Sequence, residues 1–181
     1  MNLDVTRPVL LLGGKENSLS VVRHLGKLGI PVRVSGGGTC WGMYSRYCAE
    51  KLPVPKGIPQ AVFWKRLLLD GDTRFDGHIL LAMSDDAIEF MIENRQGLSQ
   101  RYMLDDVDPD LQQAFLDKQA TLELARKAGI GAPSYWPVTS PSDIEPLRGK
   151  ARFPVMVKPR HSHKFSKIFG RKLFIVEDSF E

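Results

Sequence analysis

The chain has 181 residues, of which 43% are hydrophobic, and a formal net charge of +4. This length allows one sizeable core and is marginal for two, so one domain plus part of another fits the composition. So weak a positive charge does not by itself indicate a nucleic-acid-binding protein. The two cysteines, Cys40 and Cys48, lack the spacing of a zinc site and suggest no disulfide framework, which favours a reducing cytoplasm. The first residues contain an early aspartate and only a short apolar run, so we expect neither a signal peptide nor a membrane span.

The first part of the chain alternates between strand-like and helix-like segments, which is typical of a parallel sheet flanked by helices. Asn17 or Ser18 is expected to cap the first helix, and Gly29 is suited to end it. We predict strands at 9–12, 32–34 and 79–82, an extended piece in 47–55, a short strand in 101–104, and helices in 17–29, 59–71 and 85–98.

Two loops of this predicted sheet are candidate ligand sites. Gly13 and Gly14 end the first strand before a helix, where backbone amides could hold an anion, although a plain tight turn explains them equally well. Ser84 and Asp85 follow a later strand at its carboxyl end, where open parallel sheets place ligands, but they suit a helix cap and a helix-dipole partner as well. The dinucleotide fingerprint requires glycine within residues 15–18, which have none, so an NAD-dependent oxidoreductase is the weaker interpretation.

A domain boundary is expected near residue 108, which divides the chain into 1–108 and 109–181. Pro109 can start a helix, Lys118–Lys127 is rich in helix formers, and Gly129 and Pro133 are suited to stop it. Beyond it we predict strands in 134–138, 153–158 and 172–178 and a short helix in 140–149, which together look like half of an α+β lobe. Because the chain reaches residue 181 directly after a strand, we expect this lobe to be incomplete.

Lys158 stands at the end of an apolar run, "FPVMV", of the kind expected of a strand that is covered on both faces. Pro159 follows at once and should end the strand. The ammonium group could simply extend into solvent or pair with a surface carboxylate. However, the sequence contains no acidic residue between Glu145 and Glu177, and it contains nine lysines and arginines there, which favours an anionic partner for this segment.

The second half of the chain carries a family resemblance. "FLDKQATLELARKAGIGAPSYWPV", "RFPVMVKPRHSHKF" and "GRKLFIVED" together resemble the first subdomain of the ATP-grasp superfamily, closer to its carboxylate-amine ligases than to biotin carboxylase. Residues 1–108 look like the Rossmann-like α/β domain that precedes the grasp in those enzymes. The resemblance implies a parallel-sheet pre-ATP-grasp domain followed by a partial α+β ATP-grasp subdomain.

The resemblance also implies roles for particular residues. In this family the strand-end lysine and a lysine of the preceding helix contact the nucleotide phosphates, which assigns these roles to Lys158 and Lys118, although Lys118 alone would read as a solvated helix charge. Ser162 and Lys164 lie in the following loop, which has a single glycine, Gly170, where many relatives are glycine-rich. His161 and His163 are interpreted as donors in this loop rather than as metal ligands.

The implied reaction is ATP-dependent activation of a small carboxylate to an acyl phosphate, which an amine or similar nucleophile then attacks. ATP and Mg²⁺ are the implied cofactors, and the magnesium ligands are expected outside this chain, which alone is expected to be inactive. Gly13, Gly14, Ser84 and Asp85 are the candidate substrate-binding residues. No catalytic residue is assigned.

The alternative is a non-catalytic module that binds anions or nucleic acid through residues 148–172; Phe165 and Phe169 lie among the positive charges of this segment, and Phe174 follows it closely. Under the ligase interpretation no nucleic acid or membrane partner is expected, a homodimer is left open, and the location is cytoplasmic.

Overall fold

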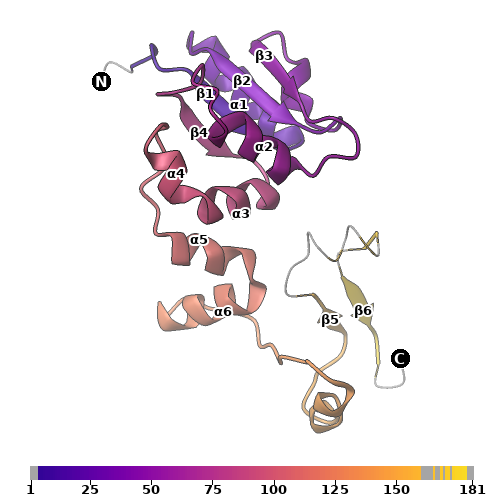
Figure 1. Cartoon of the computed structure of the whole chain (residues 1–181). Coiled ribbons are helices and arrows are strands. Elements are labelled where there is room, and N and C mark those ends of the chain that lie inside the picture. The colour runs from indigo at the N-terminus through magenta and orange to yellow at the C-terminus, as the bar shows by residue number, and fades with distance from the viewer. Residues whose placement is uncertain (1–3, 160–164, 166–167, 169, 172, 179–181) are drawn as a thin grey trace. The chain divides into compact units, whose positions relative to one another are not determined.

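The computed structural model describes residues 4–159, 165, 168, 170–171 and 173–178. The chain divides into two compact units, Met1–Gln112 and Gln113–Glu181, which are described one at a time (Figure 1). The boundary between Asp108 and Pro109 stays a prediction, because compactness does not show that either unit folds alone.

The first unit is built on a four-stranded parallel sheet in the order β3-β2-β1-β4. β1 pairs with β2 from Val9 opposite Val32, and with β4 from Val9 opposite Ile79, both in parallel. The predicted parallel arrangement of these three strands is therefore confirmed. The strands are β1 (Val9–Leu12), β2 (Val32–Gly36), β3 (Cys48–Pro53) and β4 (Ile79–Ala82), and Met103 adds a parallel bridge to Ile79.

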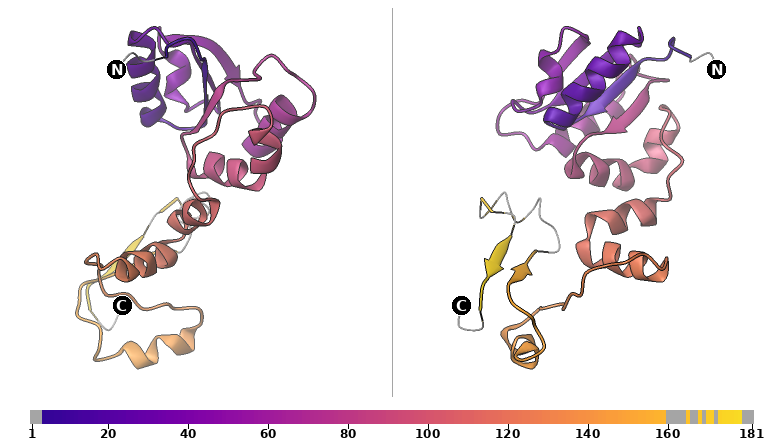
Figure 2. Two further views of the ribbon diagram at one scale, coloured as in Figure 1. Left: turned by 90° about the vertical axis from the view of Figure 1, so that its left-hand side faces the viewer. Right: turned by 180° about the vertical axis from the view of Figure 1, so that it is seen from behind.

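Helices cover both faces of this sheet, as seen from the front and from behind (Figures 1 and 2). Alternate residues of β1 enter different cores: Leu11 packs with Val22 of α1 and Met43, whereas Leu10 packs with Trp64 of α2 and with α3. All four residues of β1 are buried because they have helices on both sides. The covering elements are α1 (Glu16–Lys27), the 3₁₀ turn η1 (Trp41–Tyr44), α2 (Gln60–Leu69), α3 (Asp85–Glu93) and α4 (Arg95–Ser99).

The second unit combines helices with a small antiparallel sheet. Asp117 accepts hydrogen bonds from the backbone amides of Gln119 (2.9 Å) and Ala120 (3.4 Å), and so begins α6. β5 and β6 pair with Met156 opposite Ile175. The elements are α5 (Pro109–Leu116), which crosses the division, α6 (Lys118–Lys127), the 3₁₀ turns η2 (Pro141–Asp143) and η3 (Glu145–Leu147), β5 (Val155–Val157) and β6 (Phe174–Val176).

Four local predictions differ from the structure. The helix predicted over 85–98 is two helices, because the chain leaves helical geometry at Asn94. Residues 134–138 form no strand, and the prolines at 133 and 137 cannot donate to a sheet ladder. The helix predicted in 140–149 consists of two 3₁₀ turns. β5 is not covered on both faces by the described residues, since Met156 is 54% exposed and Val157 is 51% exposed.

Candidate functional site

The four predicted substrate-binding residues meet at one edge of the sheet. β1 has β2 on one side and β4 on the other, so the direction of strand addition reverses between β1 and β4. In open parallel sheets, ligands bind at the carboxyl ends of the strands at such a reversal. Gly13 and Gly14 leave β1 at this point, and Ser84 and Asp85 follow β4. We call these four residues the edge site.

The two loops of the edge site are in direct contact, and only glycine fits between them. Gly13 has φ +73° and Gly14 has φ +88°, a left-handed conformation that costs other residues free energy. A Cβ atom on Gly13 would overlap the Ser84 hydroxyl and lie 3.2 Å from Ser84 Cβ, and one on Gly14 would lie 2.7 Å from Met83 Cβ. The absence of these side chains brings the backbone of one loop against the side chain of the other.

Asn17 ties the same two loops together by hydrogen bonds that the sequence did not reveal. Its side-chain amide donates to the carbonyl of Met83 (2.7 Å), and its side-chain oxygen accepts from the amide of Lys15 (2.8 Å). The prediction that Asn17 or Ser18 caps α1 is wrong: Lys15 is the N-cap residue, and the Ser18 hydroxyl donates to its carbonyl (2.6 Å). The turn at Gly14 starts the helix earlier than its apolar pattern suggests.

Ser18 and Cys40 attach the loop after β2 to the edge site. The Cys40 thiol donates to the Gly13 carbonyl (3.1 Å), and the Ser18 hydroxyl accepts from the Gly42 amide (3.1 Å). Burial raises the pKa of the Cys40 thiol, so the thiol stays protonated and remains a donor. Neither contact could be read from the sequence, because both join residues that are more than twenty positions apart.

The Ser84 hydroxyl caps a helix through its oxygen and still has a proton to donate. Its hydroxyl oxygen accepts from the Ala87 amide (3.3 Å) and thereby caps α3, whose first residue is Asp85. A serine hydroxyl that accepts in this way still has its own proton to donate. The cap that the sequence allowed is therefore present, and it leaves Ser84 able to donate to an anionic ligand.

The two predicted phosphate-binding lysines stand at the ends of elements of the second unit. Lys118 is the first residue of α6 and is half-buried, and Lys158 directly follows β5 and is exposed. Neither ammonium group has a hydrogen bond or an ion pair with another described residue. Both are therefore open to an anionic ligand as far as the described part of the unit shows, and their phosphate-binding role stays a prediction.

The loop after Lys158 falls partly outside the described residues. Ser162 and Lys164, predicted to contact the nucleotide, lie there, as do His161 and His163. Of the phenylalanines that could stack on nucleic-acid bases, Phe165 and Phe174 contact each other edge to face, with ring centroids 6.2 Å apart. This contact occupies part of both rings.

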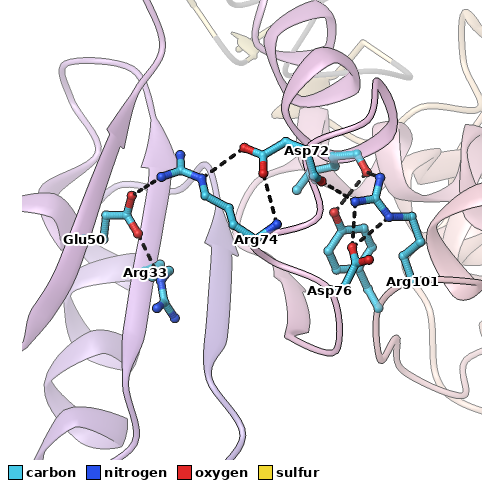
Figure 3. A network of polar contacts seen from close by, with 8 residues as sticks. Arg33, Glu50, Asp72, Arg74, Asp76 and Arg101 are labelled. Carbon is cyan, nitrogen blue, oxygen red and sulfur yellow. Dashed lines mark hydrogen bonds and ion pairs between the residues drawn. The ribbon is translucent and has the colours of Figure 1, made fainter.

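A network of polar contacts in the first unit lies away from the edge site and joins the loop before β4 to the sheet (Figure 3). Glu50 accepts from Arg33 (3.1 Å) and from Arg74 (2.9 Å), and Arg101 pairs with Asp76 (2.6 Å). The charges of opposite sign are matched across β2, β3 and this loop. The geometry is that of a structural clamp.

His78 lies buried beside this clamp. Its Nε2 atom is 2.7 Å from the Arg33 guanidinium, and the ring of Phe75 lies edge-on at 5.5 Å. Desolvation, followed by the charge of Arg33, lowers the pKa of His78, so the imidazole is neutral and Nε2 accepts from the arginine. Nδ1 then carries the proton, and it is buried with no hydrogen-bond partner among the described residues.

Among the residues that the structure describes, no group of three or more His, Cys, Asp or Glu side chains is arranged to hold a metal ion. Their helices are also all too short or too polar to cross a bilayer.

No family model matches the chain. N5-carboxyaminoimidazole ribonucleotide synthetase from Thermotoga maritima has a similar structure over 97% of the chain and 42% of its own length, with 17% identity and a TM-score of 0.64. The chain therefore has the fold of one part of this synthetase. The predicted fold class and the resemblance to ATP-grasp enzymes are confirmed at the level of the fold.

Two other solved structures share this fold, and one further protein is similar in sequence. L-amino acid ligase from Bacillus licheniformis matches over 96% of the chain and 40% of its own length, with 15% identity and a TM-score of 0.62. The Aspergillus clavatus carboxyaminoimidazole ribonucleotide synthase, solved with ATP, matches over 95% of the chain and 41% of its own length, with 17% identity and a TM-score of 0.66. A Streptomyces coelicolor protein named "Putative D-alanine--D-lactate ligase" is 39% identical over 69 residues, which are 37% of the chain and 19% of that protein. The chain thus spans about two fifths of these solved structures.

Proposed function

We propose that the chain forms part of an ATP-dependent ligase that activates a carboxylate as an acyl phosphate, which an amine or similar nucleophile then attacks. The observation that carries this proposal is the contact between the Gly13–Gly14 loop and Ser84 at the strand-order reversal. It is supported by a fold that proteins named as a synthetase, a ligase and a synthase share across nearly the whole chain, the synthase having been solved with ATP.

The edge site is proposed to hold the carboxylate substrate. Gly13 and Gly14 leave the carboxyl end of β1 at the strand-order reversal, where open parallel sheets bind ligands. The Ser84 hydroxyl can donate its proton to a carboxylate oxygen while it continues to cap α3. Asp85 begins α3 directly after Ser84 and is proposed to contact the substrate as well.

Lys118 and Lys158 are proposed to bind the ATP phosphates, with Ser162 and Lys164 completing the contact from the loop. A lysine is a compact charge with three donors, so it can stay bound to a phosphoryl group as that group moves. A carboxylate oxygen attacks the terminal phosphoryl group of ATP, which forms the acyl phosphate and releases ADP. The described residues contain no cluster fit to hold magnesium, so no step is assigned to that ion.

Isotope transfer tests the reaction directly. If an acyl phosphate forms, one oxygen of an isotopically labelled carboxylate ends up in the inorganic phosphate that is released with the ligation product. We expect ATP-dependent transfer from at least one member of a panel of small carboxylates, measured by mass spectrometry on the full protein that contains this chain. ATP hydrolysis without oxygen transfer for every member contradicts the proposal.

ATP titration by calorimetry tests the two lysines. Loss of a charge-assisted hydrogen bond of about 1.5–3 kcal/mol weakens binding roughly ten- to a hundredfold. We expect this for Lys118→Ala and for Lys158→Ala, with an unchanged melting temperature. Lys127→Ala, at the other end of α6, and Lys150→Ala, before β5, are matched controls that should bind ATP normally. Unchanged affinity in both test variants would return these lysines to the role of solvated charges.

The alternative function, an anion or nucleic-acid module built on residues 148–172, makes a different prediction. It requires binding of single strands that weakens steeply with salt, in the absence of ATP binding. The contact between Phe165 and Phe174 favours a packing role for these rings. A homodimer and a cytoplasmic location stay predictions.

A further inference from the structure

Two aromatic side chains of the first unit are exposed, and both belong to η1. Trp41 is 47% exposed and Tyr44 is 62% exposed, and among the described residues up to Gln112 no other large aromatic side chain is as open. Their ring centroids lie 6.3 Å apart at an interplanar angle of 53°. Exposed aromatic surface of this size is typical of sites that bind another ring or another protein.

The exposure of these rings is not a result of a loosely held turn. Between them, Gly42 and Met43 are buried, and the Gly42 amide donates to the Ser18 hydroxyl (3.1 Å). Cys40, which directly precedes Trp41, donates to the Gly13 carbonyl. The backbone of the turn that carries the two rings is thus fixed on α1 and on the edge site before any ligand arrives.

The surroundings of the turn indicate which ligand it suits. A Cβ atom at Gly37 or Gly38 would meet nothing within 4 Å, so the chain that leads to Trp41 borders open space. The Lys51 ammonium lies 5.5 Å from the centroid of the Tyr44 ring. A positive charge at this position favours a ring that carries negative charge and disfavours a cationic ring.

We propose that Trp41 and Tyr44 form a stacking subsite for the planar ring of an aromatic or heteroaromatic carboxylate, whose carboxylate group lies at the edge site. This inference rests on the proposed ligase function and narrows its substrate class. Stacking on a preformed aromatic surface is favourable for any planar ring and is lost for a puckered one. The subsite therefore selects substrates by shape, while the Gly13–Gly14 loop and Ser84 bind the charged group.

Two acids of the same charge and ring size test the proposal: benzoate is planar, and cyclohexanecarboxylate is not. We would titrate each into nitrogen-labelled full protein and follow the Trp41 indole N–H and the amides of Gly13 and Gly14 by NMR. We expect benzoate to shift all three signals and to bind more tightly than cyclohexanecarboxylate. Trp41→Ala should weaken benzoate binding about five- to a hundredfold.

Three variants keep the test specific. Trp41→Phe retains a planar ring and should restore most of the preference for benzoate, whereas Trp41→Leu should not. Trp136→Ala removes a similarly exposed tryptophan from the second unit, where the exposed fraction is 40%, and should leave benzoate binding unchanged. If Trp41→Leu folds normally and still prefers benzoate, the subsite is overturned.

Other outcomes separate this inference from the function on which it rests. Equal affinity for benzoate and cyclohexanecarboxylate overturns the stacking subsite. The proposed ligase function still stands in that case if labelled oxygen is transferred from a carboxylate to phosphate. Benzoate binding at Trp41 without isotope transfer from any carboxylate overturns the ligase and leaves a ring-binding surface. A Trp41→Ala variant that changes the sedimentation of the protein, rather than its affinity for benzoate, shows that the two rings form a protein interface and overturns the proposal.

Discussion

Replacing Gly13 by alanine is the sharpest structural test of the edge site. The substitution has two separable costs. A residue other than glycine at φ +73° loses roughly 1–2 kcal/mol. The added methyl group overlaps the Ser84 hydroxyl, and forcing an extra carbon into a packed position costs typically about 1–3 kcal/mol more. We therefore expect Gly13→Ala to lower the free energy of unfolding by about 2–5 kcal/mol.

Gly29 provides the matched control. It has φ +83°, and an added Cβ there would meet nothing within 4 Å. Gly29→Ala should therefore show the backbone cost alone, about 1–2 kcal/mol. Urea unfolding, followed by circular dichroism, measures both variants, and an unchanged m-value would show that the denatured state is unaffected.

A double-mutant cycle with Ser84 identifies the contact itself. Ser84→Ala alone should cost about 1 kcal/mol, because α3 loses its N-cap. In the Gly13→Ala background the same change also removes the overlapping oxygen, so the double variant should be more stable than the sum predicts, by about 1 kcal/mol. Two results together would refute the close packing of the two loops: additive free-energy changes in the double-mutant cycle, and a Gly13→Ala variant that is as stable as Gly29→Ala.

Three further predictions concern the parts of the fold that support the site. Because burial and the charge of Arg33 lower the pKa of His78 from its ordinary 6.5, the unfolded chain gains a proton first as the pH falls. Stability present above about pH 6.5 should therefore be lost as the pH drops toward the folded-state pKa. Urea titrations across this range should show that the unfolding free energy of His78→Gln depends less on pH than that of the unmodified protein. Arg101 donates to a carboxylate and to two backbone carbonyls, which a lysine cannot reproduce, so Arg101→Lys should lower the unfolding free energy by about 1–2 kcal/mol in urea titrations. Asp117→Ala should lower the unfolding free energy by about 1 kcal/mol, because α6 loses its N-cap. Thermal unfolding measures this loss against the exposed control Asp106→Ala, and equal melting temperatures of the two variants would contradict the cap.

The strands and the fold class could be predicted because their signals are local. The apolar run of β1 and the glycines that end it predict a buried parallel strand within a few residues. Lys118 and Lys158 could likewise be named from the sequence as residues that open a helix and end a strand. The predictions for 85–98 and 134–138 were wrong because propensity alone does not reveal a break at Asn94 or whether a strand has a partner.

The sequence by itself determined β1, β2 and β4, their parallel pairing and the residues that leave the carboxyl ends of β1 and β4. Only the tertiary structure decided that Gly13 contacts Ser84, that Cys40 donates to the Gly13 carbonyl, and that the rings of η1 stay exposed beside them. The reason is physical: periodicity records which face of a helix or strand is buried, over a few neighbouring residues. The approach of two loops depends instead on the order of strands in the sheet and on atoms far apart in the chain, which become neighbours only when the core has packed.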